Sequence, residues 1–246
     1  MLHVGQPGRV PEMGAINSPV PAVEQAEKPA GLMTGVALVS LIIAVLSLLL
    51  FSWIGTEVRE GDTAHFDLSV RSWVHQFFAP GITRVMVFIS ELGAIVLIVA
   101  FVASLAIFLI LRWRRAALWL VITMAGALVL DLGLKYGFHR ARPTPFFGPF
   151  PHTYSFPSGH ALMSFCFYGV LAGLINDRVQ SLIWRILVWI AAILLIAAIG
   201  LSRIYLGVHY PSDVIAGYLA AALWVSTMIF LDLLRIHRRQ IRSSSE

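Results

Sequence analysis

Long runs of hydrophobic residues dominate the pattern along this chain. They lie at about residues 32–54, 86–111, 116–138, 160–175, 183–201 and 214–234, each bounded by charged residues, proline or glycine. A helix needs about 20 predominantly apolar residues to cross the hydrocarbon core of a bilayer. The pattern therefore predicts an all-α fold: an integral membrane six-transmembrane-helix bundle with short loops.

The segments between and beyond these runs suggest three parts. Residues 1–31 contain five prolines, mixed charges and almost no large apolar residues, which predicts a disordered N-terminal tail. The first hydrophobic run begins too late and is too long to be the core of a cleavable signal peptide, so we expect a retained span. Residues 32–234 then form the membrane domain, and residues 235–246 form a basic C-terminal tail.

Composition agrees with a membrane protein. Of the 246 residues, 58% are hydrophobic and 13% are charged, whereas a soluble globular chain carries roughly 25% charged residues. The single cysteine, Cys166, excludes an internal disulfide and is expected to be a packed core residue. The formal net charge of +5 does not indicate nucleic-acid binding, because much of it flanks the hydrophobic runs.

Basic residues in the short loops predict the orientation. They lie in or around the loops after the second, fourth and sixth runs: Arg112, Arg114, Arg115, Arg178, Arg185, Arg235, Arg238, Arg239 and Arg242. Cytoplasmic loops carry an excess of lysine and arginine. Both termini are therefore expected in the cytoplasm, and the loops after the first, third and fifth runs are expected outside.

The first outer loop shows helical periodicity of its own. Its apolar positions are Phe66, Val70, Trp73, Val74 and Phe77, while Asp67, Arg71 and His75 lie elsewhere around the helical wheel. This spacing predicts an amphipathic helix lying in the membrane interface. A loop helix that merely packs on the bundle is the alternative.

The loop after the third run departs from the charge rule. It carries Lys135, Arg140 and Arg142 on the side that should be poor in cations. An inverted topology or headgroup anchoring would explain them, but the other loops agree with one another, which favours an anionic ligand. Asp131 is expected to be the partner of Lys135, because an unpaired charge within a span is costly. Glu91 is left open between a structural partner and a residue lining substrate entry.

Further polar residues fall at the outer ends of the runs. They are Pro157-Ser158-Gly159-His160, Ser202-Arg203, His209 and Asp213. Helix ends at one membrane depth can converge into one site, and there Lys135, Arg142 and Arg203 would balance the charge of a phosphate ester. Ser158 and Gly159 would add a hydroxyl and the N–H groups of a helix start.

His209 and Asp213 are four residues apart, which allows an aspartate–histidine hydrogen bond. An aspartate on one imidazole nitrogen fixes the tautomer and makes the other nitrogen more nucleophilic. His209 is then the predicted nucleophile, and His160 the donor of a proton to the leaving alkoxide. Taken singly, each residue could be a boundary anchor; His160, His209 and Asp213 could together bind a metal, but the surrounding cations would repel one.

At these residues the chain resembles the type 2 phosphatidic acid phosphatase superfamily, over about residues 85–235. The signature of that family is Lys, six residues, Arg-Pro; then Pro-Ser-Gly-His; then Ser-Arg, five residues, His, three residues, Asp. Every position is matched within residues 135–213, by Lys135, Arg142-Pro143, Pro157 to His160, Ser202-Arg203, His209 and Asp213. Three motifs in order and at these spacings are far more specific than any one of them.

The resemblance implies a six-helix membrane core and a phosphatase that needs neither metal nor cofactor. It implies a phosphohistidine intermediate on His209, with Asp213 as orienting partner and His160 as general acid. The phosphate would be held by Lys135, Arg142, Ser158, Gly159 and Arg203. The short segment 112–115, in place of a large insertion, implies the compact type.

We therefore expect an integral membrane lipid phosphatase of a bacterial inner membrane, with an extracytoplasmic active site. Its substrate would be undecaprenyl diphosphate or a lipid of the phosphatidate or phosphatidylglycerophosphate type. The expected partners are this lipid substrate and the bilayer. A lipid phosphotransferase would use the same residues. A transporter or binding protein for phosphate lipids would need neither His160 nor the His209–Asp213 pair, and the spans disfavour a haloperoxidase.

Overall fold

The computed structural model of the chain describes residues 30–148 and 153–243. Within this part, six helical stretches are long and apolar enough to cross a membrane, and no residue is in a strand. The predicted all-α fold and the predicted number of spans are therefore confirmed. The long apolar side chains of these six helical stretches are widely exposed on the outside of the bundle, as a lipid environment requires.

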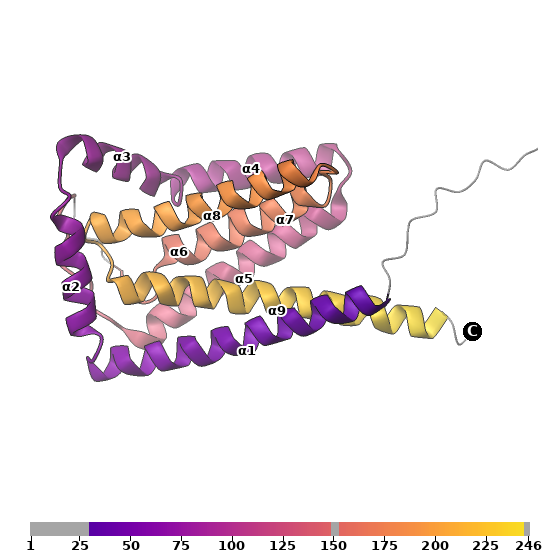
Figure 1. The fold of residues 1–246 in the computed structure, drawn as a ribbon, viewed down its shortest axis with the longest axis horizontal. Helices are drawn as coiled ribbons and strands as arrows, with labels where there is room; N and C mark the ends of the chain where they lie inside the picture. Colours follow the sequence, from indigo (N-terminus) through magenta and orange to yellow (C-terminus); the bar gives the residue numbers. More distant parts are fainter. Residues whose placement is uncertain (1–29, 149–152, 244–246) are drawn as a thin grey trace, which may run out of the picture.

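The helices follow one another as an antiparallel bundle with one crosswise element (Figure 1). They are α1 (Ala30–Glu60), α2 (Ala64–His75), α3 (Pro80–Glu91), α4 (Ile95–Ile110), α5 (Arg114–Phe138), α6 (Gly159–Ser164), the π-helical turn η1 (Phe165–Gly169), α7 (Val170–Asn176), α8 (Leu182–Tyr205) and α9 (Pro211–Ser243). The second span combines α3 and α4, and the fourth combines α6, η1 and α7.

Two of the predicted parts are only partly described. Of the tail predicted over residues 1–31, the structure describes only Ala30 and Gly31, which begin α1. The basic residues after position 234 continue α9 as a helix to Ser243. In Figure 1 the beginning of α1 and the end of α9 lie together at one end of the bundle.

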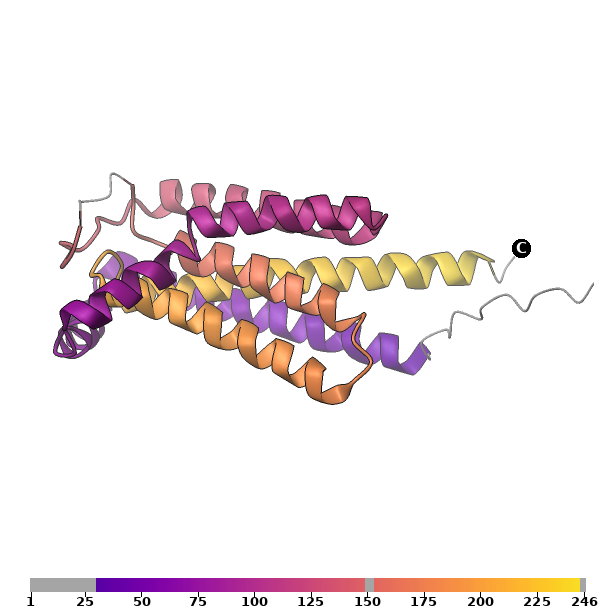
Figure 2. The same ribbon diagram turned by 90° about the horizontal axis from the view of Figure 1, so that it is seen from above.

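The second span differs from the single helix that its hydrophobic run predicts. It begins earlier, at Pro80, and a turn over residues 92–94 separates α3 from α4. At this turn a Cβ on Gly93 would lie 2.6 Å from the Ile199 side chain and 3.2 Å from the His160 ring. The absence of a side chain at Gly93 therefore lets the broken span approach α6 and α8, and α3 leaves the line of α4 there (Figure 2).

The fourth span forms the centre of the core. Leu162, Cys166 and Phe167 are completely buried, and Cys166 is the packed core residue that the sequence predicts. Helix α6 contacts α5, α8 and α9. The central position of this span brings its first residues between the ends of three other helices.

Helix α2 confirms the predicted amphipathic helix and adds its orientation. It runs across the end of the bundle, nearly perpendicular to the spans (Figure 1). Its aromatic side chains Phe66 and Trp73 are exposed, as is Phe77 just after it, whereas Asp67, Arg71 and Val74 are buried against the bundle. The exposed aromatic residues are thus free to contact the membrane interface, while Val74 packs with Tyr205 and Leu206, so the helix also packs on the bundle as the alternative expects.

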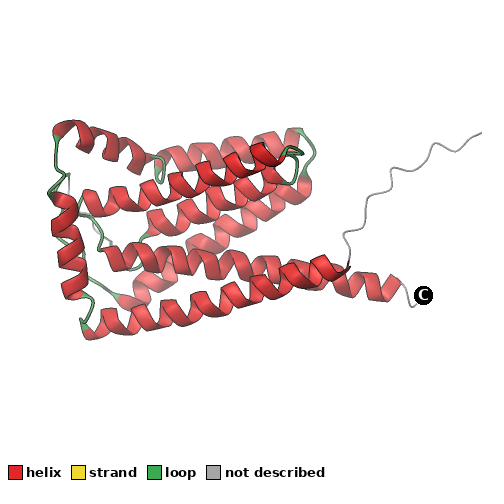
Figure 3. Ribbon diagram, viewed as in Figure 1, coloured by secondary structure: helices red, strands yellow, loops and turns green. Residues whose placement is uncertain are grey.

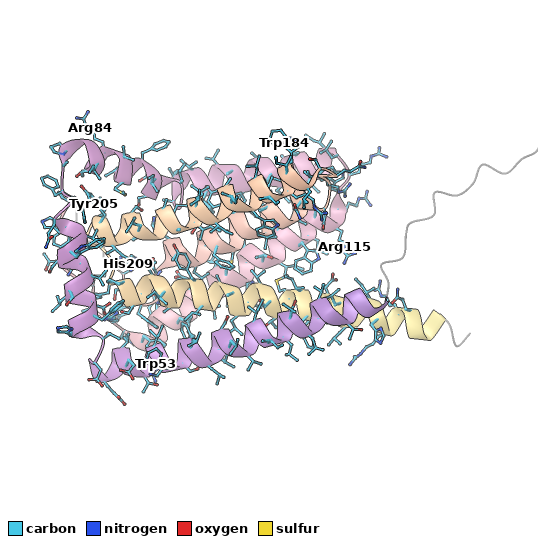
Figure 4. All side chains as sticks on the ribbon, in the orientation of Figure 1. Trp53, Arg84, Arg115, Trp184, Tyr205 and His209 are labelled. Atoms are coloured by element: carbon cyan, nitrogen blue, oxygen red, sulfur yellow. The ribbon has the colours of Figure 1, made fainter. Side chains whose placement is uncertain are left out.

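The loops that matter for function lie at the end of the bundle that carries α2. Figure 3 shows loops in green at both ends, and those near α2 include the segments 139–148 and 206–210. The opposite end is tied by an ion pair between Arg115 and Asp232, 2.5 Å apart. Figure 4 labels Arg115 at that end and His209 near α2. We call the end that carries α2 the site end.

Candidate active site

Residues from four helices and two loops converge at the site end. Lys135 comes from the last turn of α5, Arg142 from the following loop, Arg203 from the end of α8, and His209 from the loop before α9. The remaining predicted residues open two helices: Ser158, Gly159 and His160 at α6, and Asp213 at α9. A backbone hydrogen bond of 2.9 Å from the Ser158 N–H to the Asp213 carbonyl joins these two helix starts.

Local backbone geometry brings the loop residues to the site. His139 ends α5 in the left-handed conformation, with φ 51°, and so turns the chain away from the helix axis. Gly207, with φ 75°, turns the chain after α8, and a Cβ there would lie 2.7 Å from the Phe146 amide nitrogen. The positive φ and the close approach both require glycine. The loop after α5 therefore packs against the loop before α9.

His209 has the geometry of a poised nucleophile. Its ring is 1% exposed, with Nδ1 3.4 Å from Asp213 Oδ2 and Nε2 3.0 Å from Arg142 Nη1. A guanidinium has only hydrogen-bond donors, so Nε2 must accept and the proton must lie on Nδ1, facing Asp213. The unprotonated nitrogen is then the one that faces the cations.

The surroundings of His209 also set its charge. Burial, followed by the charges of Arg142, Arg203 and Lys135, holds the pKa of His209 well below its usual value of 6.5, against a smaller opposing effect of the Ser155 backbone. The imidazole is therefore neutral at neutral pH. A neutral ring with a free lone pair is the form that can attack phosphorus.

Three cations surround the space next to His209, and different hydrogen-bond partners hold each of them in place. Lys135 Nζ lies 2.6 and 2.8 Å from the two carboxylate oxygens of Asp131, which confirms the predicted pair. Arg203 donates to the Ser90 hydroxyl through Nη1. Glu91 is exposed at the end of α3, next to Ser90, the hydrogen-bond partner of Arg203.

Arg142 is held by uncharged partners, two of which are backbone carbonyls. It donates through Nε to the Thr153 carbonyl at 2.6 Å and through Nη1 to the Val208 carbonyl at 2.9 Å. Burial lowers the pKa of Arg142, while Asp213 and Asp131 act to raise it. Because carbonyls fix the guanidinium without neutralising it, its positive charge remains available to an anion.

Two buried polar atoms in this space have no hydrogen-bond partner. They are Ser158 Oγ and Arg203 Nε, two of the four such buried side-chain atoms in the described part of the chain. Buried polar groups nearly always have a partner, so these atoms point to a polar ligand. Gly159 is equally constrained, since a Cβ there would lie 2.8 Å from Lys135 Nζ.

His160 occupies the first turn of α6, next to the same space. Its ring packs against Gly93 and lies within electrostatic range of Arg203, Lys135 and Arg142. The structure thus brings all the predicted site residues together. Among the described residues, no group of three or more His, Cys, Asp or Glu side chains is arranged to hold a metal ion.

The sequence did not assign two residues that the structure places beside Asp213. Arg140 lies 2.6 Å from Asp213 Oδ1 and 2.7 Å from Asp67 Oδ2. Burial alone would lower the pKa of Arg140, but Asp213 and Asp67 outweigh it and raise the pKa. The sequence did contain a signal for both residues. Arg140 is one of the three cations that depart from the charge rule in the loop after the third run, and Asp67 lies off the apolar stripe of α2.

Comparisons with known proteins place this arrangement in a family. The PAP2 superfamily model matches residues 116–233. Phosphatidylglycerophosphatase B of Bacillus subtilis is 32% identical over 146 residues, 56% of this chain and 70% of that protein. The chain belongs to the PAP2 superfamily. The undecaprenyl-diphosphatase of Sulfolobus acidocaldarius is 37% identical over 147 residues. This match covers 57% of this chain and 66% of that protein, which is just under two thirds of its length.

A solved PAP2 structure shares the fold. The crystal structure of the transmembrane PAP2 type phosphatidylglycerolphosphate phosphatase from Bacillus subtilis matches with a TM-score of 0.68 and 26% identity, over 80% of this chain and 96% of that chain. This chain is therefore an integral membrane protein of the PAP2 superfamily, as its signature residues indicate. The matched region 116–233 contains every signature residue, whereas α1 to α4 lie before it.

The fork of Arg203 provides a direct test of the anion site. Arg203→Lys keeps the positive charge but removes the planar fork and the unpaired Nε–H. We expect kcat/KM for a lipid phosphate to fall about 10- to 100-fold, since a hydrogen bond to a charged group contributes about 1.5–3 kcal/mol. Steady-state kinetics in detergent would measure this. Arg84→Lys, at an exposed position of α3, is the matched control, and equal activity of both variants would contradict the assignment.

Proposed function

We propose that this PAP2 protein is a membrane lipid phosphatase that hydrolyses a lipid phosphate or diphosphate through a phosphohistidine on His209. The observation that carries the proposal is the buried His209 ring, whose Nε2 faces Arg142 at 3.0 Å beside the unpaired Ser158 Oγ and Arg203 Nε. A nucleophile, an anion site and unpaired donors then occupy one space. The named activities of the relatives, on undecaprenyl diphosphate and on phosphatidylglycerophosphate, support the same class of reaction.

In the first proposed step, His209 Nε2 attacks phosphorus and a P–N bond forms as the ester P–O bond breaks. The bound phosphate anion offsets the charges of Lys135, Arg142 and Arg203, so that His160 carries a proton in the complex. The leaving oxygen takes that proton, and His160 becomes neutral. Lys135, Arg142 and Arg203 stabilise the charge on the phosphoryl oxygens, which is the main contribution a protein makes to phosphoryl transfer. Asp213 stabilises the imidazolium character that develops on His209.

In the second step, water attacks the phosphohistidine and gives a proton to His160. The P–N bond breaks, inorganic phosphate is released, and His209 returns to its neutral form. His160 thus donates a proton in one step and accepts one in the other, so no further acid or base is needed. These two reaction steps require no metal and no cofactor.

The lipid is proposed to reach the site from the membrane plane. Exposed aromatic side chains lie on α2 and just after it at the site end: Phe66, Trp73, Phe77 and Phe78. Aromatic residues favour the interface where headgroups lie. Undecaprenyl diphosphate and lipids of the phosphatidate or phosphatidylglycerophosphate type present their phosphates at this depth. From the charge of the loops, we place the site on the extracytoplasmic side of a bacterial inner membrane, with both termini in the cytoplasm.

Phosphate release from a panel of lipid phosphates and diphosphates in detergent, with EDTA present, tests the proposal. We expect turnover of at least one lipid to survive EDTA, and vanadate to inhibit it as a mimic of five-coordinate phosphorus. Loss of activity with EDTA that Mg²⁺ restores would contradict the metal-free mechanism.

The same assay distinguishes the other candidate functions. A phosphotransferase would convert an added acceptor lipid into a new phospholipid and release little inorganic phosphate. A binding or transport protein would bind the lipid without producing any product. Mass spectrometry of the lipid fraction, together with the phosphate measurement, separates these outcomes.

A further inference from the structure

We propose that Arg140, anchored by Asp67 of α2, is a positioning residue that holds the Asp213 carboxylate in the orientation His209 requires. This inference rests on the proposed function, because it concerns the same nucleophile. It connects the crosswise helix α2, which precedes the matched family region 116–233, to the reacting group through Arg140 and Asp213.

The first observation is how the two oxygens of Asp213 are used. Oδ1 accepts a hydrogen bond from Arg140 Nη1 at 2.6 Å. Oδ2 accepts one from the Tyr210 N–H at 2.9 Å and lies 3.4 Å from His209 Nδ1. Because Arg140 occupies Oδ1, the carboxylate cannot rotate without losing a charge-assisted bond, so Oδ2 stays towards the imidazole.

The second observation is that Arg140 is not placed to bind the phosphate. Its Nη2 donates to Asp67 Oδ2 at 2.7 Å and to Thr63 Oγ1 at 3.1 Å, and its Nη1 also donates to Ser212 Oγ at 2.8 Å. The Tyr210 ring lies 4.2 Å from its guanidinium. Arg140 contacts the Asp213 side of the histidine–aspartate pair, whereas Arg142 contacts Nε2 on the other side of the ring.

The third observation is that Asp67 also fixes the start of α9. Its carboxylate accepts the Ser212 N–H at 2.9 Å and the Ser212 hydroxyl at 2.7 Å. The first N–H groups of a helix lack intrahelical acceptors and are stabilised by a carboxylate. Asp67 supplies that carboxylate from α2 and is completely buried. It therefore holds both Arg140 and the helix turn that carries Asp213.

A positioning role predicts a specific kinetic pattern. Loss of the Arg140 bond leaves Lys135, Arg142 and Arg203 in place, so the affinity for the phosphate group, and with it KM, should not change. The alignment of His209 with phosphorus should deteriorate, and a misplacement of about 1 Å can cost on the order of 10²-fold in rate. A phosphate-binding role would instead raise KM.

The main experiment compares Arg140→Gln/Asp67→Asn with the wild type. The pair of substitutions removes one positive and one negative charge together, and the asparagine oxygen can still accept the Ser212 N–H. Arg140→Gln alone would leave two buried carboxylates facing each other and could fail to fold. We expect the double variant to fold, as judged by a cooperative unfolding transition, and to show on the order of 10²-fold lower kcat at unchanged KM. Arg84→Gln, which removes an exposed arginine of α3, should retain wild-type kinetics.

A second background tests whether Arg140 acts through Asp213. Asp213→Asn removes the partner that Arg140 is proposed to hold, so adding Arg140→Gln/Asp67→Asn to it should cause no further loss of kcat. Groups that act as a unit are non-additive in this way. Multiplying losses, a raised KM, or wild-type kcat in the folded double variant would each overturn the inference.

Arg140→Lys gives a variant that keeps the buried charge. A single ammonium cannot reproduce the two-sided fork between Asp213 and Asp67, so a reduced kcat is expected here as well, and wild-type kcat would contradict the proposal. If the wild type is active and His209→Ala is inactive while the Arg140 variants retain full kcat, only the positioning role fails. If His209→Ala remains active, the proposed function itself fails.

Discussion

Replacing His209 by alanine should abolish lipid phosphate hydrolysis and leave the bundle folded. The imidazole is the proposed nucleophile, and without it no phosphohistidine can form. Loss of the nucleophile from a catalytic unit lowers kcat by factors on the order of 10⁶ in the best-studied hydrolases, so we expect no turnover above background. Phosphate release at saturating lipid would measure the effect.

The control for this prediction is a variant that keeps the shape of the buried site. His209→Asn retains a polar side chain in a position that is 1% exposed, and should fold like the wild type and be equally inactive. Thermal unfolding monitored by circular dichroism would verify the fold. Substantial hydrolysis by a folded His209 variant would remove the residue as nucleophile, whatever its geometry.

Replacing His160 by alanine should produce a loss that depends on the leaving group. General acid catalysis contributes about 10²- to 10⁴-fold when the leaving group needs a proton, and a lipid alkoxide does. An aryl phosphate with an acidic phenol needs none. We therefore expect a large loss of kcat/KM with a lipid phosphate and a much smaller loss with a nitrophenyl phosphate.

The same variant should reveal the intermediate. With a nitrophenyl phosphate the first step remains fast, but the second step lacks His160 as a base, so phosphohistidine should accumulate. Rapid acid-free quenching and mass spectrometry of the protein would detect a phosphate mass on the peptide that contains His209. An equal loss with both substrates, and no phosphorylated peptide, would count against His160 as the proton carrier.

These two predictions depend on features that the sequence and the structure supply separately. The order and spacing of the signature residues identify His209 and His160 as candidates without any coordinates. Their roles require more: the proton of His209 must lie on Nδ1, and the evidence for this is the 3.0 Å contact of Nε2 with Arg142. A contact between residues 67 positions apart in the chain is not visible in local spacing.

The sequence by itself determined the six spans, the candidate phosphate site and the Asp131–Lys135 pair. Each of these depends on local chemistry: a hydrophobic run long enough to cross a bilayer, a motif of fixed spacing, or two charges one helical turn apart on α5. Such features hold whichever helices become neighbours. The amphipathic helix α2 belongs to the same group, because its periodicity alone predicts it.

Only the tertiary structure decided the break between α3 and α4, the direction in which α2 points its polar face, and the partners of Arg140. At the break, Gly93 leaves room for the side chains of Ile199 and His160, which come from other spans. Asp67 and Arg140 are 73 residues apart, and both meet the start of α9. A charged side chain can be buried only where another segment supplies the opposite charge, and the sequence does not show which segment that will be.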